Sequence, residues 1–231
     1  MGNAKLNMID LSTIRTFGRL PHAPERVAAV AAHTAAGAPP PPEYPGRLPA
    51  WTPTLADNTT LPTCVVAGAA NDARAWAAAQ GYDLPIVDQK LYDLYGALAP
   101  CQPTEQAIAA TDGLVMLDAL QYLAQHGFDY GGPGPMSLTA FRVGLAAEAI
   151  REATFARGAV YAGVMLYQSD MTDDAAWHGT PAGAQAGRHC LVVIGYAPGR
   201  FMLATWGMVI MCDDDWLVGR IEEAYGLAWG L

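Results

Sequence analysis

The sequence predicts an α+β fold of two lobes, preceded by a proline-rich arm. Helical patterns dominate residues 64–126, whereas strand patterns and a hairpin turn occupy residues 159–205. Because the helices come first and the strands later, we expect separate helical and sheet layers with a cleft between them. At 231 residues, 52% of them hydrophobic, the chain is long enough for a sizeable core. We therefore expect an arm over residues 1–56 and one domain over residues 57–231.

Proline crowds the arm. Residues 25–34, directly after Pro24, are compatible with one short helix. The run Pro39–Pro42 favours polyproline II, because each ring fixes φ and removes a backbone donor. Such a segment cannot build its own core, so we expect the surface of its own domain or a neighbouring chain to hold it. A flexible tail is the alternative.

Three helices are predicted in the first half of the domain. The first begins at Cys64 and stops at Gly81, and its apolar side chains recur on one face. The others are predicted over residues 88–96 and over residues 114–126, the latter capped by Thr111-Asp112 and closed by Gly127. The prolines in residues 99–110 indicate a loop there.

The second half is predicted to be rich in strands. Residues 137–156 favour one or two further helices, residues 159–166 a buried strand and residues 168–187 a glycine-rich loop. Two strands, 191–196 and 201–205, are joined by the turn Ala197-Pro198-Gly199-Arg200. The run Asp213-Asp214-Asp215 is expected to cap a last helix or extended stretch over residues 216–225 rather than to bind a divalent ion.

Composition argues against several classes of function. A net charge of −9 disfavours nucleic acid as a partner, because that binding needs a basic face. No apolar run reaches about 18 residues, so no membrane span is expected, and the N-terminus has no signal-peptide core. The four cysteines, Cys64, Cys101, Cys190 and Cys212, have no C-x-x-C spacing, so neither a zinc site nor a disulfide framework is expected. No phosphate-binding loop is present, and we expect no cofactor.

Cys64 is the candidate nucleophile. It stands at the predicted start of a helix, where the helix dipole and free N–H groups lower the pKa of a thiol and favour the reactive thiolate. The alternative is a buried structural cysteine, since cysteine is among the most buried residue types.

His189 and Asn58 complete the candidate site. His189 begins an apolar strand 125 positions after Cys64 and is the candidate base, with Cys190 expected to point the opposite way into the core. Asn58 lies six residues before Cys64, where its amide could donate to an oxyanion together with the Cys64 N–H. A plain turn residue is the alternative for Asn58.

These segments together resemble the papain-like cysteine peptidase clan, and in particular a branch associated with bacteriophages and prophages. The resemblance spans about residues 15–229 and implies the papain-like fold. With this fold, the arm is expected either to lie across the cleft like a propeptide or to reach to another subunit. The matching positions are Asn58, Cys64, Thr111-Asp112-Gly113, His189 to Tyr196, Thr205-Trp206-Gly207 and Glu223-Ala224-Tyr225.

One position departs from the family pattern. Papain-like enzymes have Asn-Ser-Trp-Gly, whose asparagine orients the catalytic imidazole. Aligned on Trp206, this chain has Ala204 at the orienting position, and alanine has no group to accept a hydrogen bond. Because side chains alternate along a strand, Thr205 is expected to lie on the face that points away from the imidazole. A Cys64–His189 dyad with slow, narrow or no activity is therefore predicted.

Two functions follow from this resemblance. The first is a phage-encoded virion or assembly protein with a papain-like fold and weak hydrolase activity at most. It would be made in a bacterial cytoplasm, and its arm would bind other chains of the particle. The second is an active cysteine peptidase or isopeptidase with peptide substrates. The missing orienting group favours the first, and the retained Cys64 and His189 favour the second.

Overall fold

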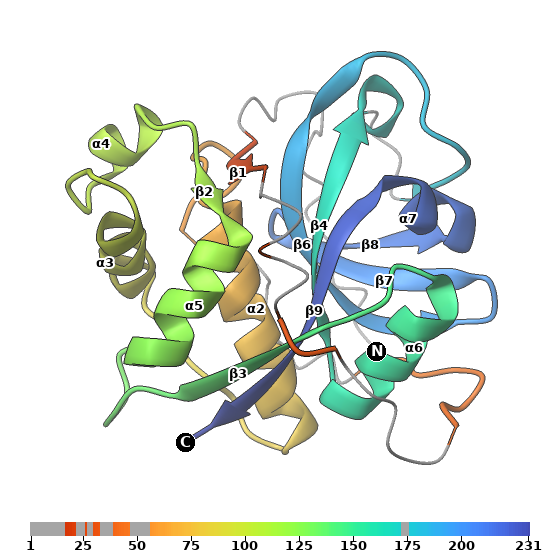
Figure 1. Ribbon diagram of the computed structural model, residues 1–231, viewed down its shortest axis with the longest axis horizontal. Coiled ribbons are helices and arrows are strands. Elements are labelled where there is room, and N and C mark those ends of the chain that lie inside the picture. The colour runs from red at the N-terminus through yellow and green to blue at the C-terminus, as the bar shows by residue number, and fades with distance from the viewer. Residues whose placement is uncertain (1–16, 22–25, 27–29, 33–38, 47–55, 172–175) are drawn as a thin grey trace, which may run out of the picture.

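The fold is α+β and has two lobes, one of helices and one built on a sheet, as predicted (Figure 1). The computed structural model describes residues 17–21, 26, 30–32, 39–46, 56–171 and 176–231. The helix predicted over residues 25–34 lies largely outside these ranges. Among the described residues, no helix is long and apolar enough to cross a membrane.

Four helices form the first lobe: α2 (Cys64–Ala79), α3 (Asp88–Leu98), α4 (Glu105–Ala109) and α5 (Met116–His126). Helix α2 lies between the other helices and the sheet (Figure 1). Its many alanines are buried on almost every side, because small side chains allow close packing on both neighbours. Its start at Cys64 and its stop before Gly81, at φ +89°, confirm the prediction.

The region before α5 differs from the prediction in two ways. Residues 99–110 contain α4, whose N-cap Thr104 accepts a hydrogen bond from the Ala107 N–H. Helix α5 begins at Met116 rather than at residue 114, because Leu114–Val115 form strand β2. Strand β2 pairs in parallel with β1 (Arg19–Leu20), a contact that local sequence does not encode. Thr111 is not the cap, since its hydroxyl donates to the Ile108 carbonyl at 2.8 Å.

The second lobe is a seven-stranded sheet in the order β3-β9-β4-β6-β7-β8-β5. Neighbouring strands are antiparallel except for β5 and β8. The elements are β3 (Ser137–Arg142), α6 (Ala147–Arg157), β4 (Val160–Tyr167), a 3₁₀ turn (Gln168–Asp170), β5 (Ala176–Trp177), β6 (Gln185–Ala197), β7 (Arg200–Thr205), β8 (Met208–Asp213), α7 (Asp214–Arg220) and β9 (Ile221–Gly230).

Pairing between strands overrides two sequence predictions. The first part of residues 137–156, predicted as helix, is β3, which pairs with β9 through contacts such as Leu138 opposite Trp229. Strand β6 begins at Gln185, inside the predicted loop, because it pairs along the whole of β4. The Asp213 cap is confirmed, since its carboxylate accepts the Trp216 N–H at 2.7 Å, whereas the stretch after α7 is strand β9.

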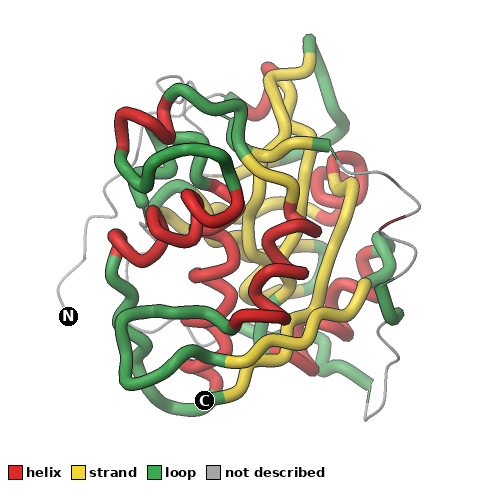
Figure 2. The backbone as a smooth tube through the Cα atoms, turned by 60° about the vertical axis from the view of Figure 1, so that its left-hand side comes forward, coloured by secondary structure: helices red, strands yellow, loops and turns green. Residues whose placement is uncertain are grey.

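The two faces of the sheet carry two cores. Cys190, Val192 and Ala204 face the core shared with α2. Leu191, Val193 and Leu203 face the opposite core, which α6 and α7 contribute to. The tube view shows the helices lying on both sides of the sheet (Figure 2). This alternation decides which side chains of β6 and β7 can meet at the candidate site.

Candidate active site

Cys64 is the first residue of α2, at the end of a turn that holds the chain in an unusual backbone conformation. Ala56 and Asp57 both have positive φ, +49° and +48°. The Thr63 hydroxyl donates to the Ala56 carbonyl at 2.7 Å. The Asp57 carbonyl accepts hydrogen bonds from the backbone N–H groups of Thr60 and Leu61. These bonds fix the entry to α2 and so the position of the thiol. The first N–H groups of the helix have no intrahelical acceptor, so they and the dipole favour an anion there.

His189 is held by two side chains from the end of β7. Its ring stacks on Trp206, with centroids 4.2 Å apart. Its Nε2 lies 2.6 Å from the Thr205 hydroxyl oxygen. Its Nδ1 is buried and makes no hydrogen bond, so this nitrogen is the one left to interact with the thiol. The imidazole is therefore oriented through Nε2 and available through Nδ1.

The prediction that Thr205 faces away from His189 is wrong. It rested on counting alternation within β7 alone. Val192 pairs with Ala204, and both face α2, so before the register shift after Val193 the odd-numbered residues of β6 share the other face with the odd-numbered residues of β7. His189 and Thr205 are both odd-numbered. Ala204 holds the sequence position of the family asparagine, but Thr205 supplies the polar contact to the ring.

The Cys64 thiol interacts with both His189 and Cys190. Burial alone would raise the pKa of Cys64, but its contacts with Cys190 and His189 hold that pKa well below the ordinary value for a thiol. Burial and the neighbouring Cys64 raise the pKa of Cys190 well above its ordinary value. Of the two thiols, Cys64 therefore has the lower pKa, which favours the thiolate at Cys64 and the neutral thiol at Cys190. Both thiols are free.

Cys190 was missed as a member of the site. Sequence reasoning directed it into the core opposite His189, and it does lie in a core, the one that contains Cys64. The sequence offered one signal for Cys190: it follows His189 on a strand expected to pack against the helix that begins at Cys64.

Asn58 lies in the turn before α2 and is 3% exposed. Its amide oxygen is buried without a hydrogen-bond partner, which is costly for a polar atom. The structure thus brings Cys64, His189, Cys190 and Thr205 together, and places Asn58 in the loop that leads to the thiol.

Part of the arm passes over this site. We call residues 17–21 the crossing segment; it contains β1 and lies between the helices and the sheet (Figure 1). A Cβ added to Gly18 would lie 2.0 Å from the carbonyl oxygen of Pro62, two residues before Cys64. A Cβ added to Gly187, two residues before His189, would lie 2.4 Å from the Phe17 ring. With the segment in place, Cys64 is 1% and His189 0% exposed.

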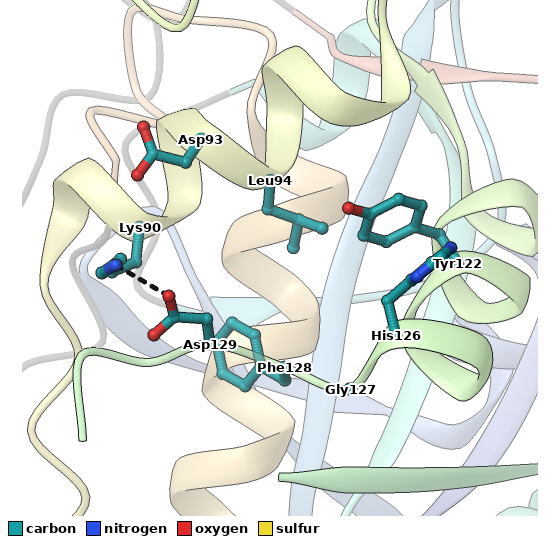
Figure 3. Close-up of a pocket in the computed structure, with 8 residues that line it drawn as sticks. All are labelled: Lys90, Asp93, Leu94, Tyr122, His126, Gly127, Phe128 and Asp129. Carbon is teal, nitrogen blue, oxygen red and sulfur yellow. Dashed lines mark hydrogen bonds and ion pairs between the residues drawn. The ribbon is translucent and has the colours of Figure 1, made fainter. Parts of the chain in front are cut away.

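Two other kinds of site come into question, a metal site and a surface pocket. Among the described residues, no group of three His, Cys, Asp or Glu side chains could hold a metal ion. A pocket of about 210 Å³ lies on the helical lobe, where Lys90 pairs with Asp129 at 2.7 Å (Figure 3). Neither Cys64 nor His189 lines it.

Comparison with solved structures identifies the fold. ProCathepsin B S9 from Trypanosoma congolense aligns with a TM-score of 0.66 at 12% identity, over 99% of this chain and 91% of that one. Xylellain, a cysteine protease from Xylella fastidiosa, aligns with a TM-score of 0.62 at 12% identity, over 93% and 91%. Procathepsin L 3 of Tenebrio molitor aligns with a TM-score of 0.61 at 11% identity, over 96% and 78%. No family model and no curated protein matches the chain.

The chain therefore has the papain-like fold, as the sequence motifs predicted. At these identities the likeness shows the fold alone. The comparisons lend no support to the phage-associated branch.

Proposed function

We propose that this protein is a cysteine peptidase, with Cys64 as nucleophile and His189 as general acid and base. One observation carries the proposal: a thiol with lowered pKa at a helix N-terminus interacts with an imidazole whose other nitrogen is held at 2.6 Å by Thr205. This arrangement is what an activated cysteine nucleophile requires.

The proposed reaction is acyl transfer. The Cys64 thiolate attacks the carbonyl carbon of a peptide, and the oxyanion is held by the Cys64 N–H and the Asn58 amide. The His189 imidazolium gives its proton to the leaving amine, which departs as the C–N bond breaks. His189 then takes a proton from water, which hydrolyses the thioester and releases the acid.

Thr205 removes one argument for a weak site. The predicted loss of activity rested on a missing partner for the imidazole, and Thr205 supplies such a partner. Thr205 is therefore proposed as the positioning residue of His189.

The virion or assembly role stays a prediction without a supporting observation of its own. The comparisons with solved structures give no support to a role in a phage particle. The residues that would bind other chains lie mostly in the parts of the arm outside the described ranges. The peptidase is the function that the site geometry supports better.

The crossing segment is proposed to hold the site closed, so that the arm acts on its own domain. The division at residues 56 and 57 is then a boundary between a blocking arm and the peptidase. A blocked site accounts for the burial of both Cys64 and His189.

Alkylation and turnover test the proposed function together. Iodoacetamide is expected to modify Cys64 in preference to Cys101 and Cys212 at mildly acidic pH, once limited proteolysis has removed the arm. The same material is expected to cleave a mixed peptide library. Cys64→Ala and His189→Ala should each abolish cleavage while the fold, followed by circular dichroism, is kept. Equal labelling of the cysteines and no cleavage in the trimmed protein would show the proposal to be wrong.

A further inference from the structure

Arg19 places a fully buried positive charge between the two lobes. It belongs to the crossing segment, and its side chain is 0% exposed. Its guanidinium forms ion pairs with Glu223, also 0% exposed, and with Glu222, which is 32% exposed. Arginine is rarely buried unless it is paired, so this contact is a specific feature of the segment.

The surroundings of Arg19 form a built pocket rather than a chance contact. A Cβ on Gly163 would lie 2.9 Å from the guanidinium carbon, so the absence of a side chain there leaves room for the charged group. The same Cβ would lie 2.8 Å from the sulfur of Met116, which closes the pocket from the helical lobe. Strand β4, strand β9 and helix α5 thus each contribute one wall.

Hydrogen bonds hold the acidic wall of the pocket in place independently of Arg19. The Tyr225 hydroxyl donates to Glu223 at 2.9 Å. Arg188 donates to Glu222 at 3.0 Å through Nε. The carboxylates are therefore positioned by their own lobe, and a planar guanidinium matches two acceptors better than an ammonium does.

The pocket adjoins the proposed site. Cys190, whose thiol interacts with Cys64, lies opposite Gly163 in the pairing of β4 with β6, and Gly163 is the residue that packs on the Arg19 guanidinium. The backbone beside the pocket already binds an extended peptide, since the Leu114 N–H donates to the Gly18 carbonyl at 2.8 Å. A peptide that replaces the crossing segment can use the same backbone donor and lie beside the thiol.

We propose that the pocket formed by Glu222, Glu223, Gly163 and Met116, here called the arginine pocket, selects peptide substrates by an arginine side chain. Arg19 is then a competitor built into the chain, and its departure leaves a buried carboxylate that favours another cation over an apolar residue. The claim that the bound peptide is a substrate rests on the proposed peptidase function. The recognition of arginine by the pocket does not depend on catalysis.

Peptide binding to an inactive chain tests the arginine pocket directly. The full-length protein carries Cys64→Ala to prevent turnover and Arg19→Ala to vacate the pocket. Two capped peptides with the sequence of residues 17–21 are titrated calorimetrically, one with arginine and one with its neutral isostere citrulline. We expect the arginine peptide to bind at least about tenfold more tightly, which corresponds to about 1.4 kcal/mol.

Two further variants identify the group that reads the charge. Glu223→Gln on the same background should remove the preference for arginine, whereas Glu222→Gln, at the partly exposed carboxylate that also pairs with Arg188, should keep most of it. Equal binding of the two peptides, or a preference unchanged by Glu223→Gln, overturns the proposal. Where Arg19→Ala does not fold, the peptides are compared at millimolar concentration on the otherwise unmodified Cys64→Ala chain by their effect on Tm. A rise with the arginine peptide alone supports the proposal, and equal effects overturn it.

The result separates this proposal from that of a peptidase. Selective binding of the arginine peptide by a protein that cleaves no peptide would support the arginine pocket and refute the peptidase function. Cleavage of a peptide library without preference for arginine would support the peptidase function and refute the arginine pocket.

Discussion

His189 meets Thr205 because two strands present the same face at one end of their pairing. The hydroxyl of Thr205 offers the imidazole one hydrogen bond from a short side chain. The stacked Trp206 adds a flat surface against which the ring rests. The orientation of the His189 ring is therefore set by one hydrogen bond and one ring contact.

Replacing Thr205 tests the positioning of the base. Thr205→Val keeps the shape and removes the oxygen, and we expect kcat to fall about 10- to 100-fold, in line with about 1–3 kcal/mol for a lost buried hydrogen bond. Thr205→Ser should retain most of the activity. The pH profile of kcat/KM should move only for the valine variant. Equal activity of all three proteins in a steady-state assay would contradict the assigned role.

The lowered pKa of Cys64 predicts how labelling depends on pH. Alkylation follows the thiolate, so in trimmed protein the rate at Cys64 should stay high below the ordinary thiol pKa of about 8.5. His189→Ala removes one of the contacts that lower this pKa, so the labelling curve should move to higher pH. Mass spectrometry of iodoacetamide-treated samples measures both curves. A curve that does not move on His189→Ala would mean that the imidazole leaves the thiol unaffected.

At the scale of elements, α2 combines packing and the site in one helix. Its alanines allow contact with the sheet on one side and with α3 and α5 on the other. The same helix carries Asp72, whose Oδ1 accepts the indole N–H of Trp229 at 2.9 Å while Oδ2 is buried without a partner. Burial raises the pKa of Asp72 from 3.8 to about 7.

Asp72 should make the protein less stable as pH rises. Below its ordinary pKa of 3.8, Asp72 is protonated in both the folded and the unfolded chain, so it carries no penalty. Between pH 3.8 and about 7 the unfolded chain loses the proton first, so the free energy of unfolding falls, by up to about 4 kcal/mol in total. Urea titrations at pH 4 and pH 8 should show Asp72→Asn gaining stability over the parent at pH 8 but not at pH 4. An equal difference at both pH values would contradict the raised pKa.

At the scale of the molecule, the crossing segment contacts both lobes beside the candidate site. It pairs with β2 on the helical side and places Arg19 against β9 on the sheet side. Three glycines accept this close approach, since a Cβ on Gly18, Gly113 or Gly187 would lie 2.0–2.4 Å from a neighbouring atom. The lobes and the segment therefore fit one another through close contacts that leave no room for a side chain at these three positions.

A single methyl group should open the site. Gly18→Ala places its Cβ against the Pro62 carbonyl, so we expect the segment to leave and the rate of Cys64 alkylation in the full-length chain to rise about tenfold or more. Gly134→Ala is the matched control, because a Cβ there meets nothing within 4 Å. Both proteins are compared with the parent by timed alkylation and thermal melts. Unchanged alkylation in Gly18→Ala would show that the segment does not block the site.

Local pattern was enough where an element depends on its own residues. The start of α2 at Cys64, its end before Gly81 and the hairpin of β6 and β7 follow from periodicity and turn residues close in the chain. Pattern was not enough for β2 and β3, whose extended backbone depends on strands 83 to 95 residues away. Apolar residues in such short stretches suit a helix and a strand equally well.

By itself the sequence determined the papain-like α+β fold and the two candidate residues Cys64 and His189, because each depends on a motif whose residues are adjacent. Only the tertiary structure decided that Thr205 contacts the ring of His189, that Cys190 interacts with the Cys64 thiol and that Arg19 pairs with two carboxylates. These contacts depend on the register between strands and on the path of the arm. Both are set by long-range packing, which no local run of residues encodes.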